Sequence, residues 1–334
     1  MSDPATFMEA RELEVHFRSG RKVARGVDNV TLEWNRGEIL GVVGESGSGK
    51  STLARALLGL VKLEGGSVAL DGSDVSGRAE LRALRRRVQM IFQDPYQTLN
   101  PRQRVGAIVA EPLVVLDVPR DQHAERVEQA LNDVGLEPER FMTRHPHELS
   151  GGQRQRVAIA ATLVLEPDGI ICDEPVSMLD VSVRSQILHV LLDLKRRRHL
   201  ALLFITHDLS LAWALCDRIA VMYLGRIVEQ GSARDVIENP RHPYTQALVA
   251  AVPSVEPGAA GRRKLLEGEL PDATDIPSGC RFHPRCPYHF EPCDKVDPPL
   301  LAAGDVPGHR AACLLLDPEL NAAPSQGHER MLED

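Results

Sequence analysis

The amino-acid sequence predicts an α/β fold followed by a smaller, cysteine-rich C-terminal region. Three observations support this prediction. A β-branched run at residues 39–43 leads through a glycine-rich loop into a helical pattern, an apolar run at 169–173 ends in two acidic residues, and four of the six cysteines follow residue 279. The 334 residues, 43% of them hydrophobic, are enough for one large domain or two medium ones with buried cores.

The overall charge and the apolar runs disfavour several classes of protein. A formal net charge of −8 argues against a main partner with a phosphate backbone, so we expect no nucleic-acid partner. No run approaches the roughly 20 apolar residues that cross a bilayer, and the N-terminal "MSDPATFMEAREL" has no apolar signal region. We therefore expect a protein of the cytosol, where thiols are kept reduced and clustered cysteines bind metals more often than they form disulfides.

A phosphate-binding loop follows the first apolar strand. The sequence Gly44-Glu45-Ser46-Gly47-Ser48-Gly49-Lys50-Ser51 fits the pattern G-x-x-x-x-G-K-S/T. The glycines let backbone N–H groups turn toward phosphates, Lys50 can reach the β- and γ-phosphates, and Ser51 can hold Mg²⁺. A chance glycine–serine turn is disfavoured, because apolar residues at helical spacing follow the loop where the phosphate site needs a helix.

The second half of the site is predicted at "GIICDEP", residues 169–175. An aspartate at the end of such a strand, here Asp173, is placed to hold Mg²⁺ through water, and Glu174 can orient or deprotonate the attacking water. In isolation, two acids after a core strand are as often simply solvated. Together with a phosphate loop upstream, they indicate an ATP-hydrolysing site.

A second anion-binding element is predicted in "HELSGGQRQRVAIA". Ser150 is a good N-cap residue, and Gly151 and Gly152 leave backbone N–H groups exposed at the start of a helix. Gln153 completes the sequence Leu-Ser-Gly-Gly-Gln. The chain therefore carries two phosphate-binding elements.

The phosphate loop, this second motif and the acidic strand end, in that order, resemble the nucleotide-binding subunit of an ABC (ATP-binding cassette) transporter over residues 8–255. The resemblance implies a P-loop NTPase fold with a RecA-like core sheet, an antiparallel β-subdomain and an α-helical signature subdomain at about residues 95–160. It also implies a head-to-tail dimer, in which ATP lies between the phosphate loop of one cassette and the signature motif of the other. ATP binding closes such a dimer, and hydrolysis lets it open.

The resemblance assigns roles to individual residues. It gives catalysis to Glu174, to His207, which contacts the γ-phosphate, and to Gln93, which contacts Mg²⁺ and the attacking water. The expected Mg²⁺ residues are Ser51, Gln93 and Asp173. The expected ATP-binding residues are Phe17 for the adenine, then Gly44, Glu45, Ser46, Gly47, Ser48, Gly49, Lys50, Ser51 and Thr52, and in trans Ser150, Gly151, Gly152, Gln153 and Asp180.

Two positions depart from the family pattern. The usual "ARAL" after the signature is Ala160-Ala161-Thr162-Leu163 here, without the arginine, and Met178 replaces a small residue in the interface loop. Neither position carries a chemical group of the reaction. We expect an active ATPase, whose rate the sequence does not predict.

The C-terminal part narrows the expected cargo. "NPRHPYTQALVAAVPS" at 239–254 and "GCRFHPRCP" at 279–287 resemble the extension of ATP-binding subunits of oligopeptide and dipeptide importers and their nickel-importing relatives. Peptide import is the favoured function, and import of nickel or another small solute is the alternative. A soluble ABC ATPase acting on ribosomes or DNA is disfavoured, because the chain has one phosphate loop and no sustained heptads.

The resemblance also implies partners and a place in the cell. The expected partners are a second ABC ATPase subunit, either a sister chain or another copy of this one, two transmembrane permease subunits and, through the permease, an extracytoplasmic peptide-binding protein. The expected location is peripheral, on the cytoplasmic face of the cell membrane. A proline- and glycine-rich linker after Pro253 suggests an extension at 256–320, followed by a flexible tail at 321–334.

The cysteines fall into two groups. Cys172 and Cys216 lie within the cassette and are expected to be small buried hydrophobes. Cys280, Cys286, Cys293 and Cys313, spaced C-x5-C-x6-C-x19-C, match neither the usual zinc hairpins nor a ferredoxin run, although four thiolates can complete either metal site. A metal site is favoured over reduced structural thiols and over disulfides. The family resemblance favours a 4Fe–4S cluster over Zn²⁺, and a redox-sensing or metal-storage role is the further alternative.

Overall fold

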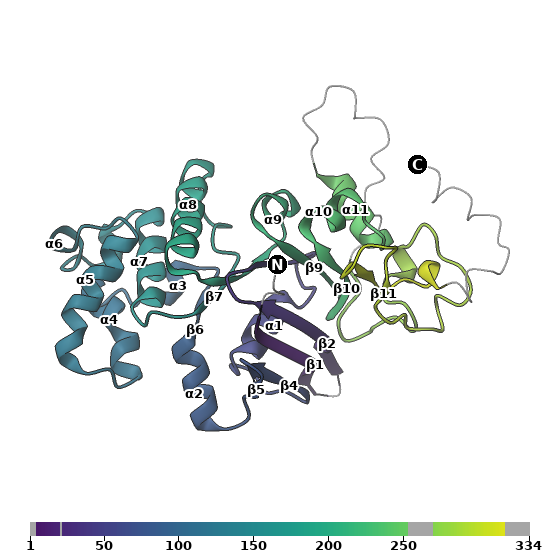
Figure 1. Cartoon of the computed structure of the whole chain (residues 1–334), viewed down its shortest axis with the longest axis horizontal. Helices are drawn as coiled ribbons and strands as arrows, with labels where there is room; N and C mark the ends of the chain where they lie inside the picture. Colours follow the sequence, from purple (N-terminus) through teal and green to yellow (C-terminus); the bar gives the residue numbers. More distant parts are fainter. Residues whose placement is uncertain (1–4, 21, 253–269, 318–334) are drawn as a thin grey trace.

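The computed structural model describes residues 5–20, 22–252 and 270–317. Two sheets and a set of helices make up this part of the chain, and they are arranged as an elongated molecule with a helical layer at one end and the C-terminal region at the other (Figure 1). The predicted tail at 321–334 and most of the predicted linker lie outside the described residues.

The smaller sheet is antiparallel and has the strand order β2-β1-β4-β5. Its strands are β1 (Thr6–Ser19), β2 (Lys22–Asn35), β4 (Gly65–Leu70) and β5 (Ser73–Asp74). In β2, buried Val27, Val30, Leu32 and Trp34 are separated by exposed or half-buried residues over most of the strand. This alternation is typical of a sheet with one face in the core, and the sheet matches the predicted antiparallel β-subdomain.

The larger sheet has the order β11-β12-β10-β9-β3-β8-β7-β6. Its strands are β3 (Ile39–Val43), β6 (Val88–Ile91), β7 (Gly169–Asp173), β8 (Ala201–Thr206), β9 (Arg218–Tyr223), β10 (Arg226–Ser232), β11 (Leu301–Ala302) and β12 (Arg310–Ala311). The strands from β9 to β6 are parallel, and β3, β7 and β8 are buried along their whole length. Because parallel strands share one carboxyl edge, the segments after β3, β7 and β8 meet there.

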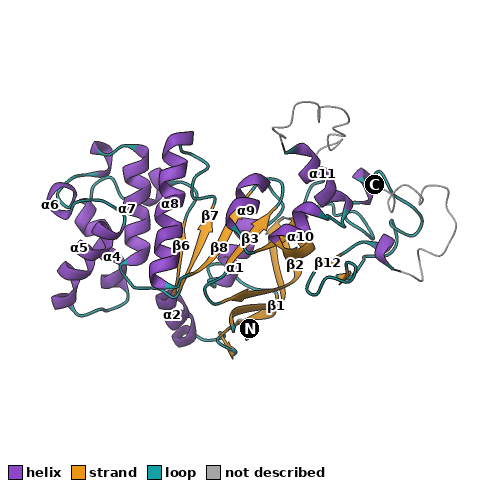
Figure 2. Cartoon of the chain, turned by 45° about the horizontal axis from the view of Figure 1, so that its top comes forward, coloured by secondary structure: helices purple, strands orange, loops and turns teal. Residues whose placement is uncertain are grey.

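Helices form the layer at one end of the molecule, and others lie along the larger sheet (Figure 2). Those between β3 and β7 are α1 (Lys50–Leu57), α2 (Arg78–Arg87), α3 (Pro95–Thr98), α4 (Val105–Val115), η1 (Arg120–Gln122), α5 (His123–Asp133), α6 (Pro138–Phe141), η2 (Pro146–Glu148) and α7 (Gly151–Leu163). The later ones are α8 (Val181–Arg198), α9 (Leu209–Leu215), α10 (Ala233–Glu238), α11 (Pro243–Ala251), η3 (His283–Arg285) and η4 (Leu314–Leu316). The run α3 to α7 matches the predicted helical subdomain.

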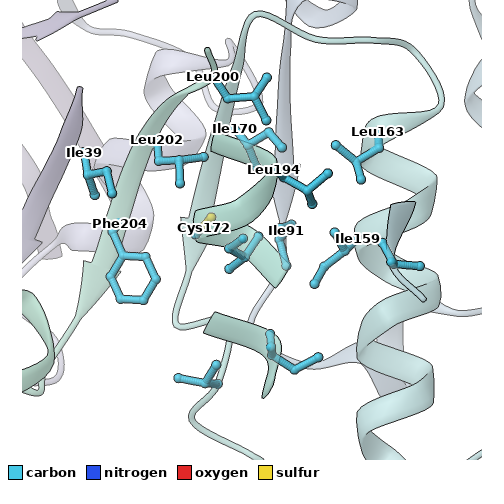
Figure 3. Close-up of a cluster of buried hydrophobic side chains, with 14 of the residues drawn as sticks. Ile39, Ile91, Ile159, Leu163, Ile170, Cys172, Leu194, Leu200, Leu202 and Phe204 are labelled. Atoms are coloured by element: carbon cyan, nitrogen blue, oxygen red, sulfur yellow. The ribbon is translucent and has the colours of Figure 1, made fainter. Parts of the chain in front are cut away.

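Two hydrophobic cores join these layers. One lies between the sheets, where Leu53 and Leu57 of α1 pack in the same cluster as Leu13 of β1 and Leu203 of β8. The other lies between the larger sheet and the helical layer, where Ile170, Cys172 and Phe204 on the strands approach Ile159, Leu163 and Leu194 on α7 and α8 (Figure 3). Cys172 and Cys216 are both buried in this second core, as the sequence predicts.

The C-terminal region continues the larger sheet. Backbone pairing of β12 with β10 places Ala311 opposite Glu229, and β11 adds the edge strand. In the described part of the chain, no helix is long and apolar enough to cross a membrane.

Candidate nucleotide-binding site

Three glycines of the phosphate loop have a positive φ, and at two of them neighbouring backbone also comes very close. Gly44 has φ 153° and Gly49 has φ 107°. A Cβ at Gly44 would lie 2.2 Å from the carbonyl oxygen of Met222, and one at Gly49 would lie 2.2 Å from that of Gly26. Both glycines are therefore required by the close approach of neighbouring backbone as well as by φ.

Lys50, the first residue of α1, folds back over this loop. Its ammonium group donates hydrogen bonds to the carbonyl oxygens of Gly44, at 2.9 Å, and of Glu45, at 2.7 Å. Burial lowers the pKa of Lys50 below its usual value, and the carboxylates of Glu174, Asp173 and Glu45 oppose that shift. The ammonium group of Lys50 thus lies against the first residues of the loop, and Ser46 and Gly47 form the exposed tip of the loop.

Ser51 and Asp173, the residues that the sequence predicts to hold Mg²⁺, lie side by side. The hydroxyl of Ser51 donates a hydrogen bond to Asp173 Oδ1 at 2.9 Å, joining the phosphate loop to the end of β7. Burial raises the pKa of Asp173, with Ser51 acting against the shift. Hydroxyl and carboxylate oxygens are the ligands that Mg²⁺ prefers, so this pair fits the ion that the sequence predicts.

The three predicted catalytic side chains meet at the carboxyl edge of the larger sheet. Gln93 donates from Nε2 to Glu174 Oε2 at 3.1 Å, and His207 Nδ1 lies 3.2 Å from Glu174 Oε1. The backbone of Glu174 is in the left-handed region, with φ 47°, and its N–H donates to Ile205 O at 3.0 Å. Each carboxylate oxygen of Glu174 therefore has its own partner, one from the segment after β6 and one from that after β8.

Phe17, predicted to stack on adenine, lies beside the same loop. Its side chain is 47% exposed, and a Cβ built on Gly26 would lie 2.8 Å from the Phe17 ring and 3.0 Å from the methyl group of Thr52. The ring thus lies close to the first turn of α1, with one part open to solvent.

The residues predicted to act in trans lie in the helical layer. Ser150 is the N-cap of α7, and its hydroxyl accepts from Gln153 N while Gln153 returns a hydrogen bond to Ser150 N. Asp180 precedes α8 and is exposed, as is Met178. Figure 1 places α7 in this layer and α1 between the two sheets, so the signature motif and the phosphate loop belong to different parts of the molecule.

Sequence reasoning missed two contacts to the phosphate loop. The hydroxyl of Tyr244 accepts a hydrogen bond from Glu45 N at 2.9 Å, and the guanidinium of Arg285 bonds both carboxylate oxygens of Glu45, at 3.0 and 3.1 Å. These residues lie about 200 and 240 positions after Glu45. Tyr244 lies in "HPYTQAL" at the start of α11, and Arg285 lies within "RFHPRCP". Both stretches are recognisable in the sequence as motifs, but the sequence does not indicate that they contact the phosphate loop.

The four C-terminal cysteines lie around one small cavity, of about 10 Å³. Burial, with a smaller contribution from the other three cysteines, raises the pKa of the Cys313 thiol to about 12. However, among residues 5–20, 22–252 and 270–317, no group of three or more histidine, cysteine or acidic side chains is arranged to hold a metal ion. The predicted metal centre, whether a 4Fe–4S cluster or Zn²⁺, is therefore not supported by the structure, which shows four free thiols.

A scan against protein-family models matches two of them. Residues 27–177 match the ABC transporter family, and residues 228–293 match the C-terminal region of oligopeptide/dipeptide transporters. Both matches include residues that the structure places around the phosphate loop.

Individual relatives agree with these matches. The chain is 47% identical over 326 residues to the oligopeptide transport ATP-binding protein OppF of Escherichia coli. This alignment covers 93% of this chain and 96% of OppF. It is 44% identical over 310 residues to a putative peptide import ATP-binding protein of Brucella ovis, covering 92% and 97%.

Solved structures show the same fold. Part of an ABC transporter complex of Clostridium perfringens, cbiO1, matches with a TM-score of 0.63 and 30% identity, over 70% of this chain and 92% of that one. A dimeric ATP-binding cassette bound to ADP and Pi after hydrolysis matches with a TM-score of 0.61 and 29% identity, over 68% and 99%. The chain belongs to the ABC transporter family of ATP-hydrolysing subunits, in the group that carries the oligopeptide/dipeptide transporter C-terminal region.

Proposed function

We propose that this chain powers the import of oligopeptides or dipeptides by hydrolysing ATP on the cytoplasmic face of a membrane-embedded permease. The observation that carries the proposal is the meeting of Gln93, Glu174 and His207 beside the Ser51–Asp173 pair, in a chain whose C-terminal region matches that of peptide transporters. Residues 8–255 form the cassette in this proposal and 256–320 the importer-type extension.

In this proposal each side chain has a task in hydrolysis. The backbone N–H groups of the loop and Lys50 hold the phosphates, and His207 lies where it can contact the terminal one. Ser51 and Asp173 would hold Mg²⁺, which would supply positive charge next to the phosphate oxygens. Glu174 accepts the proton of the attacking water, and Gln93 orients its carboxylate.

The signature motif acts on a second cassette. Ser150 and the free N–H groups at the start of α7 lie apart from their own phosphate loop (Figure 1), so they contact nucleotide held by another subunit. Closing two cassettes on ATP and releasing them after hydrolysis supplies the motion that moves the permease. The second subunit is a sister chain or another copy, and two permease subunits and an extracytoplasmic peptide-binding protein complete the importer.

The hydrolysis step is tested with Glu174→Gln in the complete complex. The amide keeps the size of the side chain but cannot take a proton, so kcat should fall by about 100-fold or more while ATP binding is kept. Asp168→Asn, at the opposite end of β7, is the matched control. Unchanged hydrolysis in Glu174→Gln would remove Glu174 from its proposed role.

The cargo is tested by purifying the intact complex with its bound solute and identifying solute and subunits by mass spectrometry. Uptake of labelled peptides into vesicles that depends on ATP and on Glu174 supports peptide import. Uptake of nickel without peptide uptake would assign the chain to a metal importer instead.

The finer prediction, a 4Fe–4S cluster or Zn²⁺ on Cys280, Cys286, Cys293 and Cys313, remains a proposal of its own. Its support is the placement of all four cysteines around one cavity, because a soft cation bound there would stabilise their deprotonated, thiolate form. Anaerobically purified protein should be brown with iron and sulfide bound. Colourless protein with one zinc would select Zn²⁺, and metal-free protein with full transport activity would reject both.

A further inference from the structure

The C-terminal region touches the phosphate loop of its own chain at two places and the neighbouring strand β2 at a third. Leu270 lies beside Gly47, 3.5 Å from the position that a Cβ there would occupy. The carbonyl of Ala273 accepts a hydrogen bond from Arg25 N on β2 at 3.2 Å. Arg285 bonds both carboxylate oxygens of Glu45. The region is therefore part of the surroundings of the nucleotide site as well as an extension of the larger sheet.

The guanidinium of Arg285 is held firmly where it meets Glu45. Its side chain is only 6% exposed. It lies over the rings of Tyr223, at 5.9 Å, and Phe282, at 6.0 Å, and a further bond joins it to the Tyr223 hydroxyl at 3.5 Å. A planar guanidinium fixed on aromatic faces forms a two-point bond with a carboxylate at little entropic cost.

Glu45 is an unusual neighbour for a triphosphate. It is the second residue of the phosphate loop, and its carboxylate has the same sign of charge as the ligand that the loop binds. Its backbone is held on both sides, by the Tyr244 hydroxyl at the N–H and by Lys50 at the carbonyl oxygen. Without a cation at its side chain, the Glu45 carboxylate would repel the phosphates that the loop binds.

We propose that Arg285 is a positioning residue for ATP binding in cis, which neutralises Glu45 and turns its carboxylate away from the phosphates. The proposal rests on the proposed nucleotide site and goes beyond it, because it gives the C-terminal region of the chain a direct part in ATP affinity. In this proposal the C-terminal region, which is typical of oligopeptide/dipeptide transporters, affects how tightly the ATP-binding cassette binds ATP.

The test measures the dissociation constant of Mg·ATP for the full chain by equilibrium titration. Arg285→Gln should weaken binding by roughly fivefold or more at low salt, and the deficit should shrink as salt is raised, because the unpaired Glu45 charge is then screened. Arg285→Lys keeps the charge but loses the two-point bond, so its dissociation constant for Mg·ATP should lie between those of the unmodified chain and of Arg285→Gln. Glu45→Gln in the Arg285→Gln background should restore affinity to within about twofold, because the repelling charge is gone.

The matched control is Asp297→Asn. It removes an ion pair between the same C-terminal region and Arg226 of β10, and that pair does not touch the loop. Its ATP affinity should stay within about twofold of the unmodified chain. Thermal melting shows which variants are folded. If Arg285→Gln does not fold, Arg285→Lys and the double variant provide the test.

Two results would overturn the proposal: Arg285→Gln binding ATP as tightly as Asp297→Asn, or the double variant binding no better than Arg285→Gln alone. The second result would mean that Arg285 only anchors the region. Failure of the unmodified chain to bind Mg·ATP would instead count against the nucleotide site itself, so the two failures can be told apart.

Discussion

Ser51 donates its hydroxyl hydrogen bond to Asp173 at 2.9 Å, which links the end of the phosphate loop to the end of β7 across 122 positions of sequence. Asp173 is 3% exposed, and burial raises its pKa. A buried carboxylate that costs energy to ionise is stabilised by a divalent cation, so the pair is suited to hold Mg²⁺.

The first prediction concerns this pair. Asp173→Asn keeps the shape of the side chain but removes the charge, so ATP hydrolysis at saturating Mg²⁺ should fall by roughly 100-fold. The Mg²⁺ concentration for half-maximal rate should rise. Asp168→Asn, which affects a surface ion pair with Arg87 at the other end of β7, should change neither quantity appreciably. Equal effects of the two variants would contradict the assignment.

The second prediction concerns His207. It is 59% exposed at its side chain and lies 3.2 Å from Glu174, so its removal should leave the fold intact and misplace the carboxylate. His207→Ala should lower kcat by about 100-fold with a small change in KM. His189→Ala, on exposed α8 surface, serves as control. A loss confined to KM would mean that His207 binds nucleotide without taking part in the chemical step.

The third prediction concerns the adenine. Because Phe17 leaves 47% of its surface open beside α1, Phe17→Ala should weaken ATP binding by roughly tenfold through lost stacking, and Phe17→Tyr should keep it. Trp213→Ala, another exposed aromatic residue, should bind ATP normally. Calorimetry measures all three, and unchanged affinity in Phe17→Ala would place the adenine elsewhere.

The fourth prediction concerns pH. Complete burial lowers the pKa of His242 from 6.5 to about 4, against a smaller opposing effect of Glu229. Between pH 6.5 and 4, His242 is therefore protonated in the unfolded chain and neutral in the folded chain. The contribution of His242 to the free energy of unfolding is fully present above pH 6.5. It is lost as the pH falls toward 4, by up to about 3 kcal/mol.

His242→Asn checks this prediction, because the amide oxygen can still accept the hydrogen bond from Tyr244 N. The free energy of unfolding should depend less on pH in the variant than in the unmodified chain between pH 6.5 and 4. Parallel pH curves would show that His242 is not the group responsible.

Most of the chemistry could be predicted from short stretches of sequence. The phosphate loop follows one buried strand, and Asp173 and Glu174 stand at the end of another. Residues such as Gln93 and His207 needed a family resemblance, since a single glutamine or histidine after a strand carries no local signal. The described residues show no metal-binding arrangement of the four C-terminal cysteines. The spacing of cysteines in a sequence limits, but does not fix, where four thiols lie in a turn-rich region.

The sequence by itself determined the strand, glycine-rich loop and helix of the predicted phosphate site and the acidic end of a buried strand, because periodicity and turn chemistry act over a few neighbouring positions. The two sheets and the helical layer were expected from the family resemblance. Only the tertiary structure decided that Gln93 and His207 share the two oxygens of Glu174, and that Arg285 neutralises Glu45. These contacts join segments that lie 33 to 240 positions apart. Their existence depends on the order of strands in the larger sheet and on the path of the C-terminal region, which no local pattern contains.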